Sequence, residues 1–486
     1  MAGRRQGRSD RPRGALREAI VPEWWGRNYG IVFAARVAMS VGRALAGVTA
    51  PIYLALEGFG AFELSLYVMV VAIASAVMST AIGLSSDRVG RRPFLICVPL
   101  LTAGAAAGFA VTASAPLLFI LGALGSFGRG AGAGAGNVGP YQPAEVAFVT
   151  DFLPPRHRNA GFGRLTFGSS LGATIGSLFG LLVSSSHTRG AAATAAFRPA
   201  FLAIAATSAL AGLVAVWLSD PRSDRAAAAK LAARTEPGAR GAQSHGGRWR
   251  LPRKSLWLLY RLSVTNTLNG MAIGMFGPFV TYWLYRRFGA GAAEVGVLYA
   301  VVNAATMASS LSAAGLARRW GVVRTVSMVR TAQALLIVPM VLSPSFIFAG
   351  GVYFVRMVVQ RVGLPLRQSY ATGLAHPDER ASVAALSNLP SQLAQSASPL
   401  LTGYLFEAVS LSVPFEIAAG LQFANAATFW AFFRRHPPED ERARTATQRT
   451  AWAVVAGGRT VAASPVLEDG PALEDGVGTE QEAVQD

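Results

Sequence analysis

The sequence predicts an all-α membrane protein with twelve transmembrane helices in two pseudo-symmetric six-helix bundles. Of its 486 residues, 52% are hydrophobic and 14% are charged, whereas roughly 25% of residues are charged in a soluble domain. The apolar residues form blocks of about 20, the length that a helix needs to cross a bilayer. Several residues of the first half also recur in the second half at one constant separation. These observations argue against a soluble enzyme, a disulfide-rich secreted domain and a disordered protein.

Twelve apolar segments are predicted to span the membrane. They are expected to be helices because an isolated strand leaves its backbone groups unsatisfied in lipid. The high glycine and alanine content suits close packing between such helices. The segments are 31–55, 62–84, 94–113, 116–148, 161–184, 199–219, 256–285, 292–316, 322–343, 345–375, 384–407 and 413–433.

Polar segments divide these spans into domains. Residues 1–27 form a basic arm, 28–219 an N-terminal six-helix bundle, 220–255 a basic linker, 256–435 a C-terminal bundle, and 436–486 a tail that becomes acidic and is predicted to be disordered. Cytosolic segments carry an excess of positive residues. With the N-terminus inside, these segments hold 33 of the 44 lysines and arginines, against four on the other side. We therefore expect a multi-pass protein of the cell inner (plasma) membrane with both termini cytosolic.

An internal duplication accounts for the division into two bundles. Five residue pairs share a separation of 227 positions, and a repeat of this kind is typical of transporters built from two related halves. The pairs are Gly47 and Gly274, Pro51 and Pro278, Arg129 and Arg356, Asp151 and Asp378, and Gly176 and Gly403.

The sequence lacks the residue patterns that most enzymatic and metal-binding sites require. The one cysteine, Cys97, rules out disulfides within the chain and thiolate metal sites. A Walker loop is absent, so the chain itself does not use ATP, and no catalytic triad or metal cluster appears. The arginines lie between apolar blocks and not on one polar face, which argues against nucleic-acid binding. We therefore expect no enzyme activity, no cofactor and no metal. The expected partners are a small-molecule substrate and the lipid bilayer, with no obligate protein partner.

A motif after the second span suggests a family. Residues 83–93 read Gly-Leu-Ser-Ser-Asp-Arg-Val-Gly-Arg-Arg-Pro, and this segment resembles the signature loop of the major facilitator superfamily. The resemblance implies the major facilitator fold and a cluster that latches the two halves together in the outward-facing state. Gly90 suits the tight turn, and Asp87 suits a helix N-terminus. The residues assigned to the latch are Gly83, Asp87, Arg88, Gly90, Arg91, Arg92, Glu145 and Asp151.

The fourth and fifth spans carry further resemblances to this superfamily. Arg129, followed by a glycine run at 130–139 and by Asp151-Phe152-Leu153-Pro154-Pro155, is similar to its arginine motif, which is linked to proton transfer in proton-coupled members. A structural role for Arg129 as a ligand of backbone carbonyls stays open, and the glycine run is expected to distort the helix. Span five has glycines four residues apart on one helix face, which favours a close helix crossing over an exporter signature. They are Gly168, Gly172, Gly176 and Gly180.

The predicted spans contain arginines but no deep acid. All histidines and aspartates lie outside them, and the glutamates, Glu145 included, lie near span ends. The resemblance implies that spans one, four, seven and ten line a central cavity. Arginines there should favour a carboxylate or phosphate. For Arg43, pairing with helix carbonyls stays open, and helix packing stays open for each polar residue. The cavity candidates are Arg36, Arg43, Arg129, Asn266, Asn269, Arg356 and Gln360.

The sequence therefore predicts a secondary active transporter that works by alternating access. Efflux of a small organic molecule is the first expectation. Uptake or exchange of an organic anion, a carboxylate or phosphate ester, is the alternative that the arginines suggest. A membrane receptor or scaffold that does not transport is a third possibility, because the loop after span eight keeps Gly315, Arg318 and Arg319 but lacks an aspartate.

Overall fold

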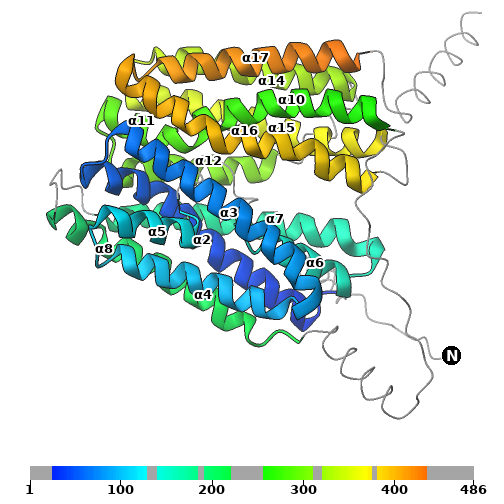
Figure 1. Ribbon diagram of the computed structural model, residues 1–486, viewed down its shortest axis with the longest axis horizontal. Coiled ribbons are helices and arrows are strands. Elements are labelled where there is room, and N and C mark those ends of the chain that lie inside the picture. Colours follow the sequence, from blue (N-terminus) through cyan, green and yellow to red (C-terminus); the bar gives the residue numbers. More distant parts are fainter. Residues whose placement is uncertain are drawn as a thin grey trace, which may run out of the picture. The chain divides into compact units, whose positions relative to one another are not determined.

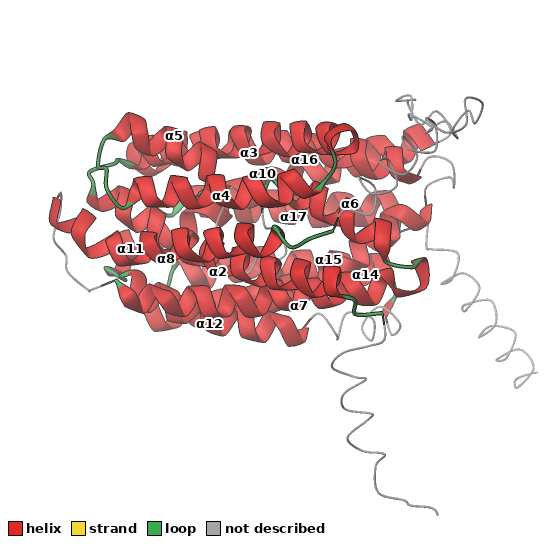
Figure 2. Ribbon diagram, turned by 90° about the horizontal axis from the view of Figure 1, so that it is seen from below, coloured by secondary structure: helices red, strands yellow, loops and turns green. Residues whose placement is uncertain are grey.

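The computed structural model describes residues 24–127, 139–183, 191–219, 255–309, 320–374 and 380–434. Within these residues every regular element is a helix, in agreement with the predicted fold class (Figure 2). The chain divides into two compact units, Met1–Pro437 and Pro438–Asp486, and all described residues belong to the first. Most of the predicted arm and linker and the whole predicted tail lie outside the described residues.

The described helices lie on both sides of several segments that are outside the described residues. In chain order they are α2 (Arg27–Leu56), α3 (Ala61–Val89), α4 (Arg92–Phe109), α5 (Ala115–Gly125), α6 (Gln142–Phe152), α7 (Pro155–Leu178), η1 (Phe179–Leu182), α8 (Ala191–Ala215), α10 (Leu256–Phe276), η3 (Gly277–Phe279), α11 (Val280–Phe288), α12 (Ala292–Ser309), α14 (Val322–Val341), α15 (Phe346–Leu374), α16 (Arg380–Ala408) and α17 (Val413–Phe433).

Each of the twelve predicted spans contains a helix. Among the described residues, six helices are long and apolar enough to cross a membrane: α2, α4, α14, most of α3, most of α8, and most of α7 together with η1. Helices α5 and α12 are apolar but shorter. Their predicted spans continue into residues 128–138 and 310–319, which lie outside the described residues.

Several helix boundaries differ from the predicted spans, and two of these differences affect the candidate site. The expected loop 83–93 is helical as far as Val89, so only Gly90 and Arg91 separate α3 from α4. Gly90 has a φ of 97°, a conformation that a residue without a Cβ adopts easily. The predicted span 116–148 is not one uninterrupted helix, because α5 already ends at Gly125 and Ser126 is left-handed with a φ of 54°.

The two prolines that the repeat pairs, in spans one and seven, affect their helices differently. Pro51 lies inside α2, which continues past it to Leu56. Pro278 lies in the 3-10 turn η3, which separates α10 from α11. Because proline cannot donate the backbone hydrogen bond of a helix, it weakens the helix at both places. The neighbouring Gly277 lowers helix propensity further in the seventh span only.

The helices pack in two sets within the first unit. Neighbours in the N-terminal set include α2 with α7 and α8, and α4 with α8. Neighbours in the C-terminal set include α10 with α16, and α14 with α15 and α17 (Figure 1). The two sets meet where α3 packs against α16 and where α7 packs against α12. These two pairs form the seams between the sets.

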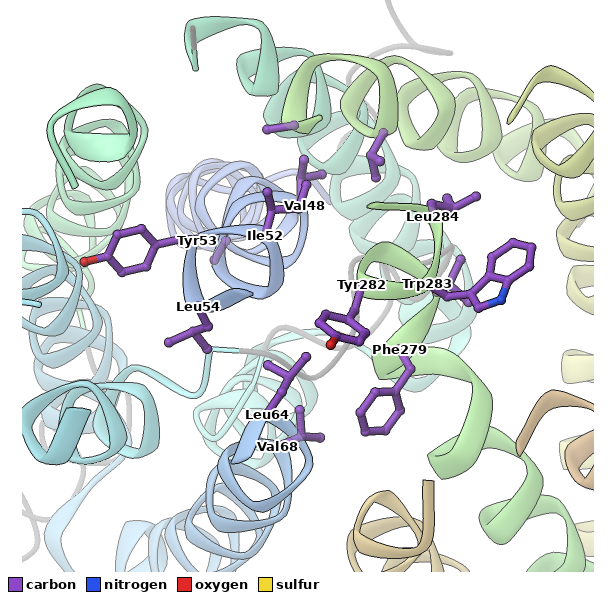
Figure 3. Packing of buried hydrophobic residues seen from close by; sticks show 14 of the residues in the cluster. Val48, Ile52, Tyr53, Leu54, Leu64, Val68, Phe279, Tyr282, Trp283 and Leu284 are labelled. Atoms are coloured by element: carbon purple, nitrogen blue, oxygen red, sulfur yellow. The ribbon is translucent and has the colours of Figure 1, made fainter. Parts of the chain in front are cut away.

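One buried apolar cluster joins the two sets. It contains Leu64 and Tyr53 from the N-terminal set together with Phe279 and Trp283 from the C-terminal set, and all four side chains are at most 1% exposed (Figure 3). The cluster gathers around the ends of α2 and α10 and the start of α3. We call this end of the helices, which carries Tyr282, the Tyr282 end.

The opposite end of the helices, which carries Arg91, is packed differently. There the N-terminal set has its own cluster, with Tyr29 and Phe148 in its centre, and the C-terminal set has another, with Leu258 and Phe433. The described apolar core therefore bridges the two sets at the Tyr282 end, and at the Arg91 end it forms a separate core in each.

Candidate functional site

Arg36 is buried in α2 and is 5% exposed. Its guanidinium is ion-paired with the carboxylate of Glu145 on α6, and its Nε donates a hydrogen bond to Ser169 Oγ on α7. The expectation of an acid-free environment is wrong for Arg36, because the packing of α6 brings Glu145 against it. Glu145, which we assigned from the sequence to the latch, thus links α6 to α2.

Arg43 lies two turns further along the same helix and is half-buried. Its Nη2 donates to the backbone oxygen of Ser126 over 3.3 Å. A Cβ added at Gly139 would lie 2.5 Å from Arg43 Nη1. Ser126 follows α5 and Gly139 precedes α6, so Arg43 packs against both described edges of the interruption in span four. This geometry corresponds to the carbonyl-pairing alternative that the sequence left open. Arg129 lies outside the described residues.

Arg356 is buried in α15 and is 6% exposed. Its guanidinium carbon lies 3.9 Å from the centre of the Phe276 ring on α10. Its Nη1 donates to Met357 Sδ over 3.7 Å, a weak contact, and its Nε has no hydrogen-bond partner among the described residues. Neither of the two ion pairs found among these residues includes Arg356. A buried guanidinium without an ion-pair partner among the described residues can bind an anion.

Two further residues of α15 lie close to Arg356 in the helix. Gln360 is one turn away, and its buried Oε1 has no hydrogen-bond partner among the described residues. The same holds for Nη2 of Arg361. Sequence reasoning placed Arg361 within a span but not in the cavity set. We use the name α15 polar face for Arg356, Gln360 and Arg361, of which Arg356 and Gln360 share one side of the helix.

The two predicted asparagines of span seven are engaged within the C-terminal set. Asn266 Nδ2 donates to the backbone oxygen of Ser387 on α16 over 2.9 Å. Asn269 Oδ1 accepts a long hydrogen bond of 3.5 Å from Asn425 on α17. Asn425 Oδ1 in turn accepts from Arg330 on α14 over 2.7 Å. These contacts favour helix packing, the alternative that stayed open for each of them.

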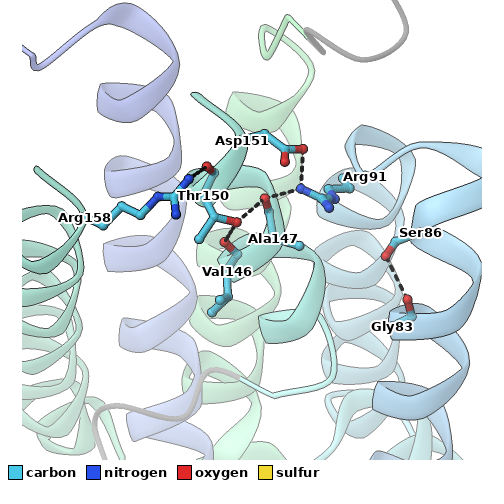
Figure 4. Close-up of polar contacts among 8 residues, drawn as sticks. All are labelled: Gly83, Ser86, Arg91, Val146, Ala147, Thr150, Asp151 and Arg158. Atoms are coloured by element: carbon cyan, nitrogen blue, oxygen red, sulfur yellow. Dashed lines mark hydrogen bonds and ion pairs between the residues drawn. The ribbon is translucent and has the colours of Figure 1, made fainter. Parts of the chain in front are cut away.

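Three of the predicted latch residues, Arg91, Arg92 and Asp151, make contacts near the turn between α3 and α4. Arg91 is ion-paired with Asp151 at the end of α6 and also donates to the backbone oxygen of Ala147 (Figure 4). Arg92 donates to the backbone oxygen of Val216, just after α8, over 2.6 Å. Basic groups at the carboxyl ends of helices are favourable because of the helix dipole. Gly83 lies within α3, and the side chains of Asp87 and Arg88 lie outside the described ones.

The four glycines of span five face two different neighbours. Gly168, Gly172 and Gly176 pack against Phe33, Val37 and Val41 of α2, where a Cβ would meet a side chain or a backbone carbonyl. Gly180 instead packs against Ala292 at the start of α12, in the other set. The glycines thus allow close approach both within the N-terminal set and across a seam.

A hydroxyl network that the sequence did not signal joins the two sets. Thr281 of α11 shares a 2.9 Å hydrogen bond with the hydroxyl of Tyr299 on α12 and donates to the backbone oxygen of Gly47 on α2 over 3.4 Å. Threonine and tyrosine are common in apolar spans, so the sequence pattern does not distinguish these two residues as contacts between the sets. Among the described residues, no three histidine, cysteine, aspartate or glutamate side chains gather where a metal could bind.

The sequence matches one family model over most of its length. The model of the Major Facilitator Superfamily matches residues 32–350 and 262–468. The chain belongs to the major facilitator superfamily. None of the curated proteins matches the sequence.

Solved structures of transporters share the fold. A peptide transporter, POT, in complex with sulfate has a TM-score of 0.64 and 16% identity, and the match covers 87% of this chain and 98% of that chain. A bacterial homologue of the human lysosomal transporter Spinster, in an inward-facing conformation, has a TM-score of 0.62 and 15% identity, covering 85% and 98%. The xylose transporter XylE from E. coli, in an inward open conformation, has a TM-score of 0.62 and 14% identity, covering 83% and 95%.

Membership of the superfamily establishes the general function. This major facilitator protein is a multi-pass membrane protein and a secondary transporter of a small molecule, not an enzyme. In such proteins two helical sets move around a central site.

Proposed function

We propose that this transporter moves a small organic anion and that the α15 polar face binds its negative group. The observation that carries the proposal is Arg356, a buried guanidinium that stacks on Phe276 and whose Nε has no hydrogen-bond partner among the described residues. A buried cation without a counter-charge is costly in a membrane protein and is functional by default. A carboxylate or phosphate would supply both the charge and the missing hydrogen bond.

The depth of Arg356 supports a substrate role. It lies ten residues from Phe346 at the start of α15, which is about 15 Å along the helix. This distance is about half of the hydrocarbon thickness of a bilayer. Phe276 and Met357 also belong to the cluster that closes the Tyr282 end. Arg356 therefore lies next to that closure, near the middle of the membrane, which is where transporters of this type bind substrate.

The neighbouring residues narrow the substrate class further. Gln360 Oε1 is a hydrogen-bond acceptor without a partner among the described residues, and Arg361 Nη2 is a donor without one. An anion with a hydroxyl or amino group would use both of them. Arg36 does not serve in this way, because Glu145 already neutralises it.

We propose export as the direction of transport, in line with the first expectation from the sequence. We also propose that the protein resides in the cell inner membrane with both termini in the cytosol, based on the distribution of lysine and arginine. The α15 polar face supports the charge class of the substrate and has no bearing on direction.

Thermal-shift screening of the purified protein tests the charge class. Ligand that binds the folded state raises the melting temperature by mass action. We expect anionic compounds to raise it while matched neutral and cationic compounds do not, and we expect Arg356→Gln to abolish the rise. Arg261→Gln is the matched control, because Arg261 stacks on Trp257 and donates to the Phe432 backbone oxygen. A rise with cations, or an anion response that survives Arg356→Gln, would refute the proposal.

Uptake measurements with the best anion test direction and transport itself. Export predicts accumulation in inside-out vesicles when an ion gradient is applied, and little accumulation in right-side-out vesicles. Binding without movement in either orientation would favour the receptor alternative.

A further inference from the structure

A contact between the two helical sets lies at the start of α3. The backbone N–H of Phe62, the second residue of α3, donates a 2.8 Å hydrogen bond to Oε1 of Glu407 near the end of α16. The first N–H groups of a helix have no partner within the helix, and the helix dipole favours a carboxylate beside them. Glu407 therefore caps a helix of the other set.

This cap is separate from the one that α3 provides for itself. Glu63 Oε2 accepts a 3.0 Å hydrogen bond from the backbone N–H of Gly60 within the same segment. Gly60 also makes room for Glu407, since a Cβ at this position would lie 2.7 Å from Glu407 Oε1. A side chain at position 60 would therefore displace the carboxylate.

The cap lies at the end of a tightly packed seam. One turn before Glu407, Gly403 lies against Ala61 and Ser65 of α3, and Ser65 is fully buried there. A pocket of about 440 Å³ lies beside the seam, and its wall includes Gly60, Tyr282, Arg286 and Glu407. This is the Tyr282 end, where the apolar core bridges the two sets.

We propose that Glu407 is a releasable latch that holds the Tyr282 end closed. Alternating access requires this end to open during each cycle, and opening separates α3 from α16. The Phe62–Glu407 hydrogen bond then breaks, and α3 keeps only its local cap from Glu63. The latch stabilises the closed state relative to the open one. This role for Glu407 rests on the alternating-access mechanism of the superfamily and does not depend on which substrate is transported.

Thiol labelling in detergent tests the latch without any assumption about orientation. The reporter is Ser65→Cys in a Cys97→Ser background, because Ser65 is buried against α16 and becomes accessible only when the seam opens. Glu407→Ala removes the latch, and Gly60→Ala displaces the carboxylate without removing its charge. We expect both to speed labelling by about two- to five-fold, the factor that corresponds to one carboxylate at a helix N-terminus.

Glu63→Ala is the matched control, because it removes the local cap of the same helix and leaves the contact between the sets in place. It should lower the melting temperature while labelling stays within about 1.5-fold of the parent, well below the effect of losing a helix-terminus carboxylate. The proposal would be overturned if both Glu407→Ala and Gly60→Ala were labelled at the same rate as the parent protein. An equal rise with Glu63→Ala would also overturn it, because fraying of α3 would then control access. If Glu407→Ala does not fold, Gly60→Ala and Glu407→Gln decide the question.

Discussion

Arg36 of α2 and Glu145 of α6 form a buried ion pair in which the two side chains are 6% and 1% exposed. Removing one member of such a pair leaves an uncompensated charge, whereas removing both is often tolerated. The pair therefore gives a test that separates charge balance from substrate binding.

Glu145→Gln should destabilise the protein by about 3–5 kcal/mol, because it leaves the Arg36 charge buried. The double variant Arg36→Gln/Glu145→Gln should recover a large part of this loss. Melting temperatures in detergent measure both effects. A double variant that is no more stable than Glu145→Gln would contradict the interpretation that charge balance is the main role of the pair.

Gly139→Ala should destabilise the protein because Gly139 has a φ of 96° and lies against Arg43 Nη1. The left-handed conformation alone costs a residue with a side chain about 1–2 kcal/mol. Gly163→Ala is the control, since Gly163 lies inside α7 with nothing within 4 Å of an added Cβ. It should be neutral or stabilising by up to about 1 kcal/mol. Similar melting temperatures for the two variants would show that stability does not depend on the left-handed glycine beside Arg43.

Asp151→Asn should lower stability by about 1 kcal/mol, because Asp151 is 21% exposed and pairs with the buried Arg91. Both residues belong to the N-terminal set, so labelling of Ser65→Cys should not change. Glu416→Gln removes an exposed charge from the first turn of α17 and is the control for charge alone. Faster labelling in Asp151→Asn would mean that the pair also acts between the sets.

Asp87→Asn should strongly lower transport and leave membrane insertion intact, as the resemblance of its motif to the superfamily latch implies. Transport rates in proteoliposomes measure this. Glu63→Gln, at the opposite end of the same helix, is the control for loss of one acid from α3. If Asp87→Asn transports at the rate of the parent protein, Asp87 has no role in the transport mechanism.

The linker 220–255 should be cytosolic, because it carries nine positive residues. A cysteine at position 244, made by Ser244→Cys in a Cys97→Ser background, should resist membrane-impermeant thiol reagents in intact cells. A cysteine made by Ser114→Cys, between α4 and α5, should react from outside. The reverse pattern would invert the orientation.

The candidate site was predictable from the sequence in part. Arg356 and Gln360 stand out because charged and polar side chains are rare inside apolar segments. The partner of Arg36 could not be found in the same way, because Glu145 is 109 positions away and lies near the end of its predicted span. Glu407 gave no signal either, since an acid near a span end is common and its contact with Phe62 depends on the packing of α16 against α3.

The sequence by itself determined the helical membrane class, the approximate positions of the spans and the superfamily. These follow from segment length, hydropathy and local motifs, because lipid forces each apolar segment to satisfy its own backbone hydrogen bonds. Only the tertiary structure decided that Glu145 neutralises Arg36 while the Nε of Arg356 has no hydrogen-bond partner among the described residues. It also decided that the described apolar core bridges the two sets at the Tyr282 end. In lipid, helices associate through close packing and specific polar contacts. Such contacts join residues far apart in the chain, and hydrophobic periodicity carries no information about them.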